Sequence, residues 1–589
     1  MSIIETLRSK CRDCYKCLRA CPVKAIKVER GPGIHEVHAS VHEDYCTYCG
    51  TCLTECPQKA KKARVDTDRV KEFLRHGEKV AASIAPSFAA SIEHPMRFVT
   101  ALRKAGFSIV QETALGAEMV SAYHRELLLE SPKKPYIGSA CPAVVSLVQK
   151  HYPEAIPFLA PVVSPAIAHG KYLKQVTPGV KVVFIGPCIA KKDEIEDPAV
   201  AGAVDVALTF QEALDWLKTE GIKVAKCAVG KFDGPLPSKA RLYPTDGGFL
   251  YATCDGGIMD RNRLSVSGMQ AAIETIRHFL RCKELPQLAE LLACDGGCLA
   301  GPSAVTGRDL YEKRRMLLAY QEESAKADPP GEPQDYASLL PREALKRSFR
   351  NLKVPVSQPS EKELREILEK SGKYGPEDEL NCGACGYSSC RDKAVAAFNG
   401  MADPVMCIPF MRQRAESMAN VVVSATPDGI IVTTLDGTIV DMNDSAELIT
   451  GRSKKSSIGL RVAEIMDATS FNEAARTKAD SRRETTIGNF VVDEQVLYVP
   501  DQKLLVAILM DITEPRRQME RRMRVAEEAI QRATQVIEKQ MAVAQKIAGV
   551  LGETTAETKI SLTALINVIG EEMPSSDTTK SGSGGSSTQ

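Results

Sequence analysis

The feature that most constrains this chain is a cysteine run that occurs twice within its first 60 residues. Both copies read C-x2-C-x2-C-x3-C-P. Because these spacings let three thiolates of one loop meet one 4Fe-4S cube while the fourth reaches a second cube, the repeat predicts two clusters with crossed ligands. Zinc sites or disulfides are the alternatives, but zinc has no need of such a double repeat. The predicted ligand sets are Cys11, Cys14, Cys17 and Cys56 for one cluster, and Cys46, Cys49, Cys52 and Cys21 for the other.

The overall composition agrees with metal ligation. Nineteen cysteines, mostly in tight clusters behind an N-terminus without an export signal, favour bound metal in a reducing cytoplasm over disulfides. A formal net charge of +1 gives no strong attraction to nucleic acid or to an anionic membrane, and no apolar run reaches transmembrane length. We therefore expect a cytoplasmic protein with no nucleic-acid or membrane partner.

The length of 589 residues predicts several domains, and the pattern along the chain predicts a mixed α+β and α/β architecture. β-rich runs at 80–88, 181–188 and 204–210 alternate with amphipathic helices, which is typical of an α/β domain with buried strands. The expected segments are a two-cluster module (1–65), the α/β domain (66–352), a second cysteine-rich module (361–410), a domain of short alternating strands (415–514), a helix with an apolar 3–4 repeat (515–551) and a mostly disordered low-complexity tail (552–589).

Four more cysteines lie in loops rich in Gly, Ala and Pro, where backbone can approach a bulky inorganic group. Any one of them alone could be a buried apolar residue. Their loops read GSACPAVV, IGPCIAKKDE and ACDGGCLAG, and they contribute Cys141, Cys188, Cys294 and Cys298. Together, and behind two ferredoxin-type runs, these loops resemble the three signature loops of the iron-only (FeFe) hydrogenase family. The resemblance covers about residues 1–352 and includes an expected helical ending over 345–354.

The resemblance implies a catalytic H-cluster. The four loop cysteines would hold a 4Fe-4S cubane, and Cys298 would bridge it to a two-iron unit that carries CO, cyanide and a dithiolate with a central amine. Lys191 would donate a charge-assisted hydrogen bond to a cyanide. Glu194 matches a family Glu in the same loop, but an ordinary solvated charge or a partner of the lysine is an equal alternative.

Departures from the family pattern are confined to the surroundings of the ligands. Ala140 stands where fast members have a proton-relaying cysteine, and Gly186 and Leu292 stand where the family usually has methionine. Because groups around a metal site tune its potential and proton access, we expect an intact site with slow turnover. Neutral drift is the alternative.

The second cysteine cluster has the spacing C-x2-C-x4-C-x16-C and comprises Cys382, Cys385, Cys390 and Cys407. It resembles the small 4Fe-4S domain of corrinoid iron–sulfur and electron-transport subunits, which implies a third accessory cluster. Four cysteines also suit tetrahedral zinc, so zinc is the alternative.

Residues 415–514 resemble a PAS domain, with Asn443 leading a helix and Asp511, Ile512 and Thr513 forming the exit into a signalling helix. The segment contains no His and no Cys, so we expect it to relay a signal rather than bind haem or form a flavin adduct. A plain dimerisation module is the alternative. The helix at 515–551 would pair in a homodimer.

Two functions from different classes remain open at this point. The first is a slow hydrogenase that acts as a hydrogen or redox sensor and signals to a separate kinase or phosphatase. The second is a metabolic hydrogenase that exchanges electrons with a carrier such as ferredoxin. A third interpretation is a homologue that never receives the two-iron unit and only shuttles electrons.

Overall fold

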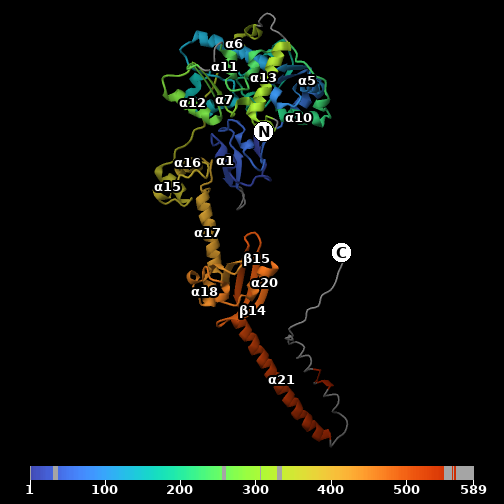
Figure 1. Ribbon diagram of the computed structural model, residues 1–589, viewed down its shortest axis with the longest axis vertical. Coiled ribbons are helices and arrows are strands. Elements are labelled where there is room, and N and C mark those ends of the chain that lie inside the picture. Colours follow the sequence, from blue (N-terminus) through green and yellow to red (C-terminus); the bar gives the residue numbers. More distant parts are fainter. Residues whose placement is uncertain are drawn as a thin grey trace. The chain divides into compact units, whose positions relative to one another are not determined.

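The computed structural model describes residues 2–30, 37–254, 260–304, 307–327, 335–548, 560–561 and 563–564. It divides into two compact units, Met1–Met411 and Arg412–Gln589, and each is described by itself (Figure 1). Most of the expected disordered tail lies outside the described residues. No described helix combines the length and the hydropathy needed to cross a lipid bilayer.

The first 65 residues form a module of two antiparallel strand pairs. β1 (Ile4–Thr6) pairs with β4 (Lys61–Ala63), and β2 (Ile26–Arg30) pairs with β3 (Val37–Val41). The two cysteine runs adopt the same backbone path, because left-handed residues recur at equivalent positions of both repeats. The equivalent pairs are Asp13 and Tyr48, Tyr15 and Gly50, and Lys24 and Lys59. Each run also carries one short helix, α1 (Lys16–Ala20) or α2 (Thr51–Thr54).

The next domain contains two parallel sheets, as the sequence pattern predicts. The larger sheet has the order β6-β5-β8-β9, and the smaller has the order β10-β11-β7. Their strands are β5 (Val80–Ile84), β6 (Ile109–Glu112), β7 (Tyr136–Ile137), β8 (Lys181–Gly186), β9 (Val206–Thr209), β10 (Arg263–Ser267) and β11 (Leu288–Leu292). Every residue of β5, β9 and β11 is buried, which is why these strands are mostly apolar.

Helices cover these sheets, and most of their inward-facing residues join one large hydrophobic core. In Figure 1, α5 and α10 lie at one end of the domain and α12 lies at the other. The helices are α3 (Thr67–Arg75), α4 (Phe88–Ser91), α5 (Pro95–Lys104), α6 (Ala114–Glu130), α7 (Pro142–His151), α8 (Pro165–Val176), α9 (Ala190–Glu194), α10 (Phe210–Thr219), α11 (Gly248–Thr253), α12 (Met269–Arg281), α13 (Leu310–Ala327) and α14 (Arg342–Leu345).

The expected helical ending over 345–354 is wrong. Helix α14 stops at Leu345, and the chain then runs without helix past residue 354. Lys346 forms an isolated antiparallel bridge with Val162, and Arg347 turns its guanidinium inward to buried carboxylates. These tertiary contacts replace the helical hydrogen bonds that the local sequence favours.

The second cysteine-rich module has two helices, α15 (Glu361–Glu369) and α16 (Cys390–Phe398). Its residues Tyr387, Ala402 and Met406 belong to the same hydrophobic core as Cys17 and Cys21 of the N-terminal module. The two iron–sulfur modules are therefore packed together within the first unit.

The second unit contains a five-stranded antiparallel sheet in the order β13-β12-β16-β15-β14 with its own small core. As predicted, Asn443 caps a helix: its side-chain oxygen accepts from Ala446 N at 2.9 Å. The elements are β12 (Gly429–Thr434), β13 (Ile439–Met442), α18 (Asp444–Thr450), α19 (Lys454–Ser457), α20 (Thr469–Thr477), β14 (Ser481–Ile487), β15 (Phe490–Val499) and β16 (Leu504–Asp511). Helix α17 (Ile408–Ala425) spans the boundary between the two units.

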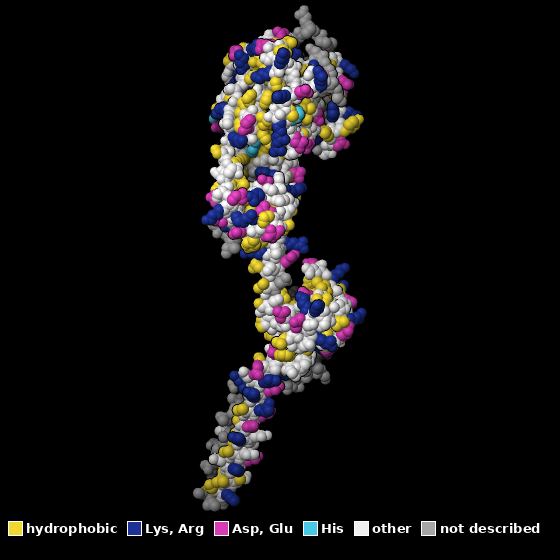
Figure 2. Space-filling model, turned by 90° about the vertical axis from the view of Figure 1, so that its left-hand side faces the viewer, with side chains coloured by type: hydrophobic (Ala, Val, Ile, Leu, Met, Phe, Trp, Pro, Cys, Tyr) yellow, Lys and Arg dark blue, Asp and Glu magenta, His cyan; other side chains and the backbone are white. Residues whose placement is uncertain are grey.

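The long helix that follows the sheet is α21 (Thr513–Ala548). Hydrophobic side chains occur along its length among many charged ones (Figure 2). The predicted helix is present over the described residues, whereas its pairing with a second copy stays a prediction.

Candidate functional site

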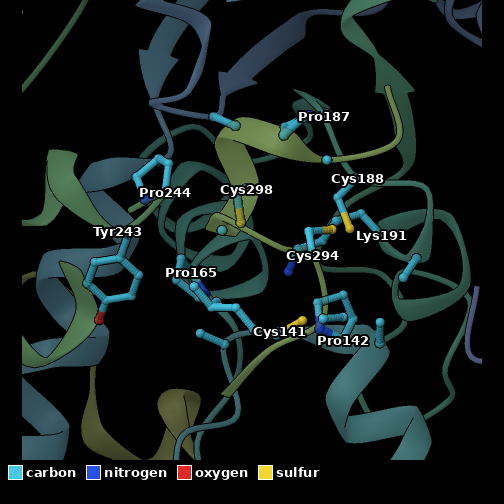
Figure 3. Close-up of a pocket in the computed structure, with 18 of the residues that line it drawn as sticks. Cys141, Pro142, Pro165, Pro187, Cys188, Lys191, Tyr243, Pro244, Cys294 and Cys298 are labelled. Atoms are coloured by element: carbon cyan, nitrogen blue, oxygen red, sulfur yellow. The ribbon is translucent and has the colours of Figure 1, made fainter. Parts of the chain in front are cut away.

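The four loop cysteines converge because each loop follows the carboxyl end of a parallel strand. Cys188 comes two residues after β8, Cys294 comes two residues after β11, and Cys141 caps the start of α7 shortly after β7. Cys298 lies in a short 3-10 turn of the same loop as Cys294. Ligands of α/β proteins commonly bind outside the carboxyl ends of parallel strands. Figure 3 shows the four sulfur atoms around one space.

These cysteines line a cavity of about 120 Å³ whose wall is mostly apolar. Lys191 and Glu290 are the charged residues among the described residues that line it. A glycine is required next to Cys298, because Gly297 has φ +74° and a Cβ there would lie 2.4 Å from the carbonyl oxygen of Pro244. The loop can therefore fold tightly around a bulky group.

Burial raises the pKa values of the thiols in this cavity. It raises the pKa of Cys188 to about 12 and raises the pKa values of Cys141, Cys294 and Cys298, and the charges of neighbouring thiols raise the values of Cys188, Cys294 and Cys298 further. Four convergent thiolates in an apolar cavity need a cationic group to compensate them. This donor set fits an iron–sulfur cluster, and Cys141, Cys188, Cys294 and Cys298 are the residues that would hold it.

Lys191 belongs to a buried network at the edge of the cavity. Its Nζ donates to Ser164 Oγ at 2.8 Å and to Glu194 Oε2 at 2.5 Å, and Glu194 Oε1 accepts from Arg347 Nη1 at 3.0 Å. The Glu194 side chain is fully buried, so the solvated-charge alternative is wrong and the lysine-partner alternative holds. The network fixes Lys191 with its charge beside the cysteine loops.

Arg347 is a site residue that sequence reasoning missed. Its guanidinium is 3% exposed and pairs with Glu194 and with Asp197 at 2.8 Å. No sequence signal marks it, since it lies in the stretch whose pattern favours a helix.

Lys192, the next residue after Lys191, serves a different purpose. It is buried and contacts Asp66 at 2.7 Å and Glu212 at 2.9 Å, away from the cavity. This contact fastens the chain just after the N-terminal module to the α/β domain. Two adjacent lysines of equal appearance in the sequence thus have separate roles.

The position of the absent relay cysteine is in the cavity wall. Ala140 lines the cavity beside Cys141, and its methyl group can neither donate nor accept a proton. At Gly186, a Cβ would lie 2.6 Å from the ring of Phe184, so that ring occupies the space a longer side chain would need. Phe184 and Leu292 both contribute to the wall. Ala140, Phe184 and Leu292 thus give the cysteines an apolar neighbourhood.

Glu290 is a second residue that sequence reasoning missed. It lines the cavity, accepts hydrogen bonds from Ser265 Oγ at 2.8 Å and Phe249 N at 3.1 Å, and burial raises its pKa to about 7. A carboxylate inside the otherwise apolar strand LAELL was the available signal.

The N-terminal cysteines form two neighbourhoods, named here the Cys11 group (Cys11, Cys14, Cys17, Cys56) and the Cys21 group (Cys21, Cys46, Cys49, Cys52). Burial first, and then the charge of Cys49, raise the pKa of Cys21 to about 11. The pKa of Cys17 is also raised by burial first, and the charges of Cys11 and Cys56 add to that shift. Cys21 thus lies within electrostatic range of Cys46, Cys49 and Cys52, and Cys56 lies within range of Cys17. Ala25 N and Ala60 N donate equivalent 3.3 Å hydrogen bonds to Cys21 Sγ and Cys56 Sγ.

The C-terminal cysteine group (Cys382, Cys385, Cys390, Cys407) lines a separate cavity. Lys373, Lys393 and Tyr387 line it too, and all three are buried. The Tyr387 hydroxyl has no hydrogen-bond partner within the described structure. A buried hydroxyl within electrostatic range of Cys385 fits a cluster whose sulfur atoms accept hydrogen bonds.

The three cysteines not yet discussed line neither of the two cysteine-lined cavities described above. Cys227 is buried in the main core, Cys254 ends α11, and Cys282 is exposed after α12.

Family comparisons match four segments of the chain. Residues 78–302 match the C-terminal domain of the iron only hydrogenase large chain, and residues 10–60 match a 4Fe-4S dicluster domain. Residues 378–409 match a family of Fe-S cluster domains, and residues 417–504 match the PAS fold.

Individual relatives are more distant. A curated relative, the cytosolic Fe-S cluster assembly factor NAR1 of Yarrowia lipolytica, is 29% identical over 188 residues, and the match covers 28% of this chain. The chain spans 36% of that relative's length. An FeFe-hydrogenase structure from Chlamydomonas reinhardtii is 18% identical, with a TM-score of 0.36, over 47% of this chain and 95% of the other. A domain of an HTR-like protein from Haloarcula marismortui is 24% identical, with a TM-score of 0.14, over 15% of this chain and 100% of the other.

The matched segments follow one another in the order that the sequence motifs predict. The chain therefore carries the C-terminal domain typical of iron-only hydrogenase large chains, preceded by a 4Fe-4S dicluster domain and followed by an iron–sulfur domain and a PAS domain.

Proposed function

We propose that this protein is a slow FeFe hydrogenase that interconverts hydrogen with protons and electrons and acts as a hydrogen or redox sensor. The observation that carries the proposal is the mostly apolar cavity in which four cysteines from three loops meet Lys191 while Ala140 occupies the neighbouring wall position. The ligand set supports hydrogen chemistry, and the missing proton relay supports low turnover. The PAS domain and α21 support a signalling role.

Each residue has a definite task in this mechanism. An H-cluster held there would supply a Lewis-acidic iron and a basic amine, which are the groups that split hydrogen. Cys141, Cys188, Cys294 and Cys298 would hold that group through their sulfur atoms. Lys191 would donate a charge-assisted hydrogen bond to a cyanide of that group, and Glu194 orients that lysine. The apolar wall excludes water.

Proton and electron movement are limited by different parts of the chain. Ala140 cannot pass a proton, so protons move slowly between the cavity and solvent. Electrons have a short way out, because Cys49 of the Cys21 group lines the same cavity as Cys294. The N-terminal module would pass them to a carrier such as ferredoxin.

The proposed output is protein contact rather than catalysis. The sequence contains no histidine after His278, so it offers no phosphate-accepting histidine in the C-terminal part. We propose that a homodimer joined along α21 reports to a separate kinase or phosphatase.

Infrared spectroscopy of the matured protein tests the proposal. CO and cyanide stretching bands are expected in the wild type, and Lys191→Met should shift the cyanide bands because it removes their hydrogen-bond donor. Lys133→Met, at an exposed position of the same domain, is the matched control and should leave the bands unchanged.

Two alternatives give other results. A metabolic hydrogenase would show the bands together with high turnover. An electron shuttle without the two-iron unit would show none of the bands, and the similarity of 188 residues to a cluster assembly factor is the observation that favours it.

A further inference from the structure

The C-terminal cysteine group is docked directly on the N-terminal module. Gly386 lies so close to α1 that a Cβ there would be 3.2 Å from Arg19 Cα. Val28 N donates a 3.2 Å hydrogen bond to Met401 O, which ties β2 to the loop after α16. The docking surface is part of a continuous core, so the contact is a packed one rather than a surface touch.

The C-terminal cysteine group is docked beside the Cys21 group rather than beside the Cys11 group. Lys24 lies within electrostatic range of both Cys21 and Cys385, and Tyr387 lies within range of the same two thiols. On its other side, the Cys21 group reaches the catalytic cavity through Cys49, whose charge acts on Cys294. The Cys21 group therefore stands between the catalytic cavity and the C-terminal cysteine group.

The C-terminal cysteine group also has a distinctive polar environment. Lys373 and Lys393 are 6% and 4% exposed and both line its cavity. Lys393 Nζ donates to Pro404 O and lies within electrostatic range of Cys407 and Cys385. The orphaned hydroxyl of Tyr387 is a further donor at the same cavity. Positive charge and hydrogen bonds to cluster sulfur favour the reduced, more negative state.

We propose that the C-terminal cysteine group is the terminal electron acceptor of this chain, filled through the Cys21 group and held at a higher reduction potential than both N-terminal clusters by Lys393 and Tyr387. The inference rests on the proposed function only in that hydrogen is the source of the electrons. In each transfer one electron leaves the cluster at the Cys21 group, which is oxidised, and enters the C-terminal cluster, which is reduced. No bond forms or breaks, and no proton is required.

This role differs from that of a cluster that only passes electrons to an outside carrier. Of the two N-terminal groups, only the Cys11 group has an exposed cysteine, Cys14, so it is the one of these two that can offer electrons to an outside carrier. The Cys21 group becomes a branch point, with one route to solvent and one to the module that precedes the PAS domain. Lys393 and Tyr387 are positioning residues here, since they set a potential and do not touch hydrogen.

A redox titration of the full-length, cluster-loaded protein tests the assignment. Dithionite replaces hydrogen as the reductant, so the result does not depend on hydrogen activity, and paramagnetic resonance follows each cluster. The C-terminal cluster is identified as the signal that Cys385→Ala removes. It should be reduced first in the wild type, and in the fully reduced protein its signal should be magnetically coupled to that of the Cys21 group.

Three variants make the test specific. Lys393→Gln should weaken the electron affinity of the C-terminal cluster about tenfold, which is a fall of ~59 mV for one electron. Tyr387→Phe should lower it in the same direction and provides a second test if Lys393→Gln fails to fold. Lys362→Gln, at an exposed position on α15, should change nothing.

The proposal is overturned if the C-terminal cluster is reduced together with or after the N-terminal clusters, or if Tyr387→Phe and Lys393→Gln both leave its potential unchanged. An uncoupled spectrum of the fully reduced protein would also overturn the route through the Cys21 group. A protein that passes these tests but fails to consume hydrogen would instead contradict the proposed function alone.

Discussion

Ala140 is the residue whose replacement gives the sharpest test of slow turnover. A thiol at this position would border the cavity next to Cys141 and could carry a proton to the bound amine. Well-placed acid–base groups contribute on the order of 100-fold or more to a rate. We expect Ala140→Cys to raise hydrogen evolution by the matured protein by that order, whereas Ala143→Cys, elsewhere in the same wall, should not. Equal rates would mean that another step limits the enzyme.

Two buried histidines make the stability of the α/β domain depend on pH. His169 accepts a 2.7 Å hydrogen bond from Ser83 Oγ and donates a 3.0 Å bond to Gln111 Oε1, which accounts for both ring nitrogens of the neutral form. Burial lowers the pKa of His169 to about 3 and that of His124 to about 4. An unfolded histidine titrates near 6.5. Below that pH only the unfolded chain takes up these protons, so folding becomes less favourable.

We therefore expect the free energy of unfolding to be unaffected by these groups above pH 6.5 and to fall below it. The loss is about 1.4 kcal/mol per pH unit for each histidine until its folded-state pKa is approached. Urea unfolding at pH 7.5 and at pH 5.5 measures it. His169→Gln should reduce the slope by about half, and an unchanged slope would show that other groups dominate.

The convergence of Cys141, Cys188, Cys294 and Cys298 was accessible from the resemblance of their loops, and that of the C-terminal cysteine group from its short spacings. Arg347 and Glu290 were not. Arg347 depends on a chain reversal that brings residues about 150 positions apart into contact, as its 3.0 Å bond to Glu194 shows. Glu290 becomes part of the cavity only when its strand joins a sheet beside β10 and β7. Residues that act through tertiary contacts of this kind leave no local pattern.

At the scale of elements, apolar runs predicted strands well, since β5, β8 and β9 lie within the predicted segments 80–88, 181–188 and 204–210. Buried parallel strands need nothing but continuous apolar residues. The prediction of a helix over 345–354 was wrong because tertiary contacts decide the conformation there. Helical propensity is weak compared with the buried ion pairs of Arg347.

Helix α21 offers a test of dimerisation in which two adjacent residues serve as variant and control. Ile537 belongs to the predicted apolar seam and is partly covered by its own helix, whereas Val536 is 55% exposed beside it. Lysine in a dimer seam must be desolvated without a partner. We expect Ile537→Lys to shift the protein from dimer to monomer in analytical ultracentrifugation and Val536→Lys to leave the dimer intact. Two monomeric variants, or two dimeric ones, would contradict the assigned seam.

At the scale of the whole molecule, iron content distinguishes clusters from zinc. Sixteen cysteines assigned to four cubanes, together with one two-iron unit, require about 18 irons per chain. Elemental analysis of the matured protein should find that content and no stoichiometric zinc. A value near 14 irons with one zinc would show that the C-terminal cysteine group is a zinc site.

The sensor proposal predicts a change at a distance from the clusters. Reduction of the C-terminal cluster alters the charge just before α17, and a two-state helix can carry that bias onward. Hydrogen exchange over 515–548 should therefore differ between protein under hydrogen and protein under oxidant, and Cys385→Ser should remove the difference. Identical exchange in both wild-type states would leave the PAS domain as a dimer clamp only.

The buried contact between Lys192 and Asp66 has a consequence for how the domain organisation of this chain can evolve. A gene fusion that joins a ferredoxin to a hydrogenase domain is easily reversed as long as the two domains make only weak contacts. Here, a deletion that extends through Asp66 would leave the ammonium group of Lys192, which is 1% exposed, with Glu212 as its remaining carboxylate partner. A buried charge left without any partner costs roughly 3–5 kcal/mol, and Lys192, which keeps Glu212 and the carbonyl oxygen of Ala207, would lose only part of that amount. A deletion confined to residues 1–65 would keep this contact, so the buried pair marks Asp66 as the point before which the N-terminal module can be lost.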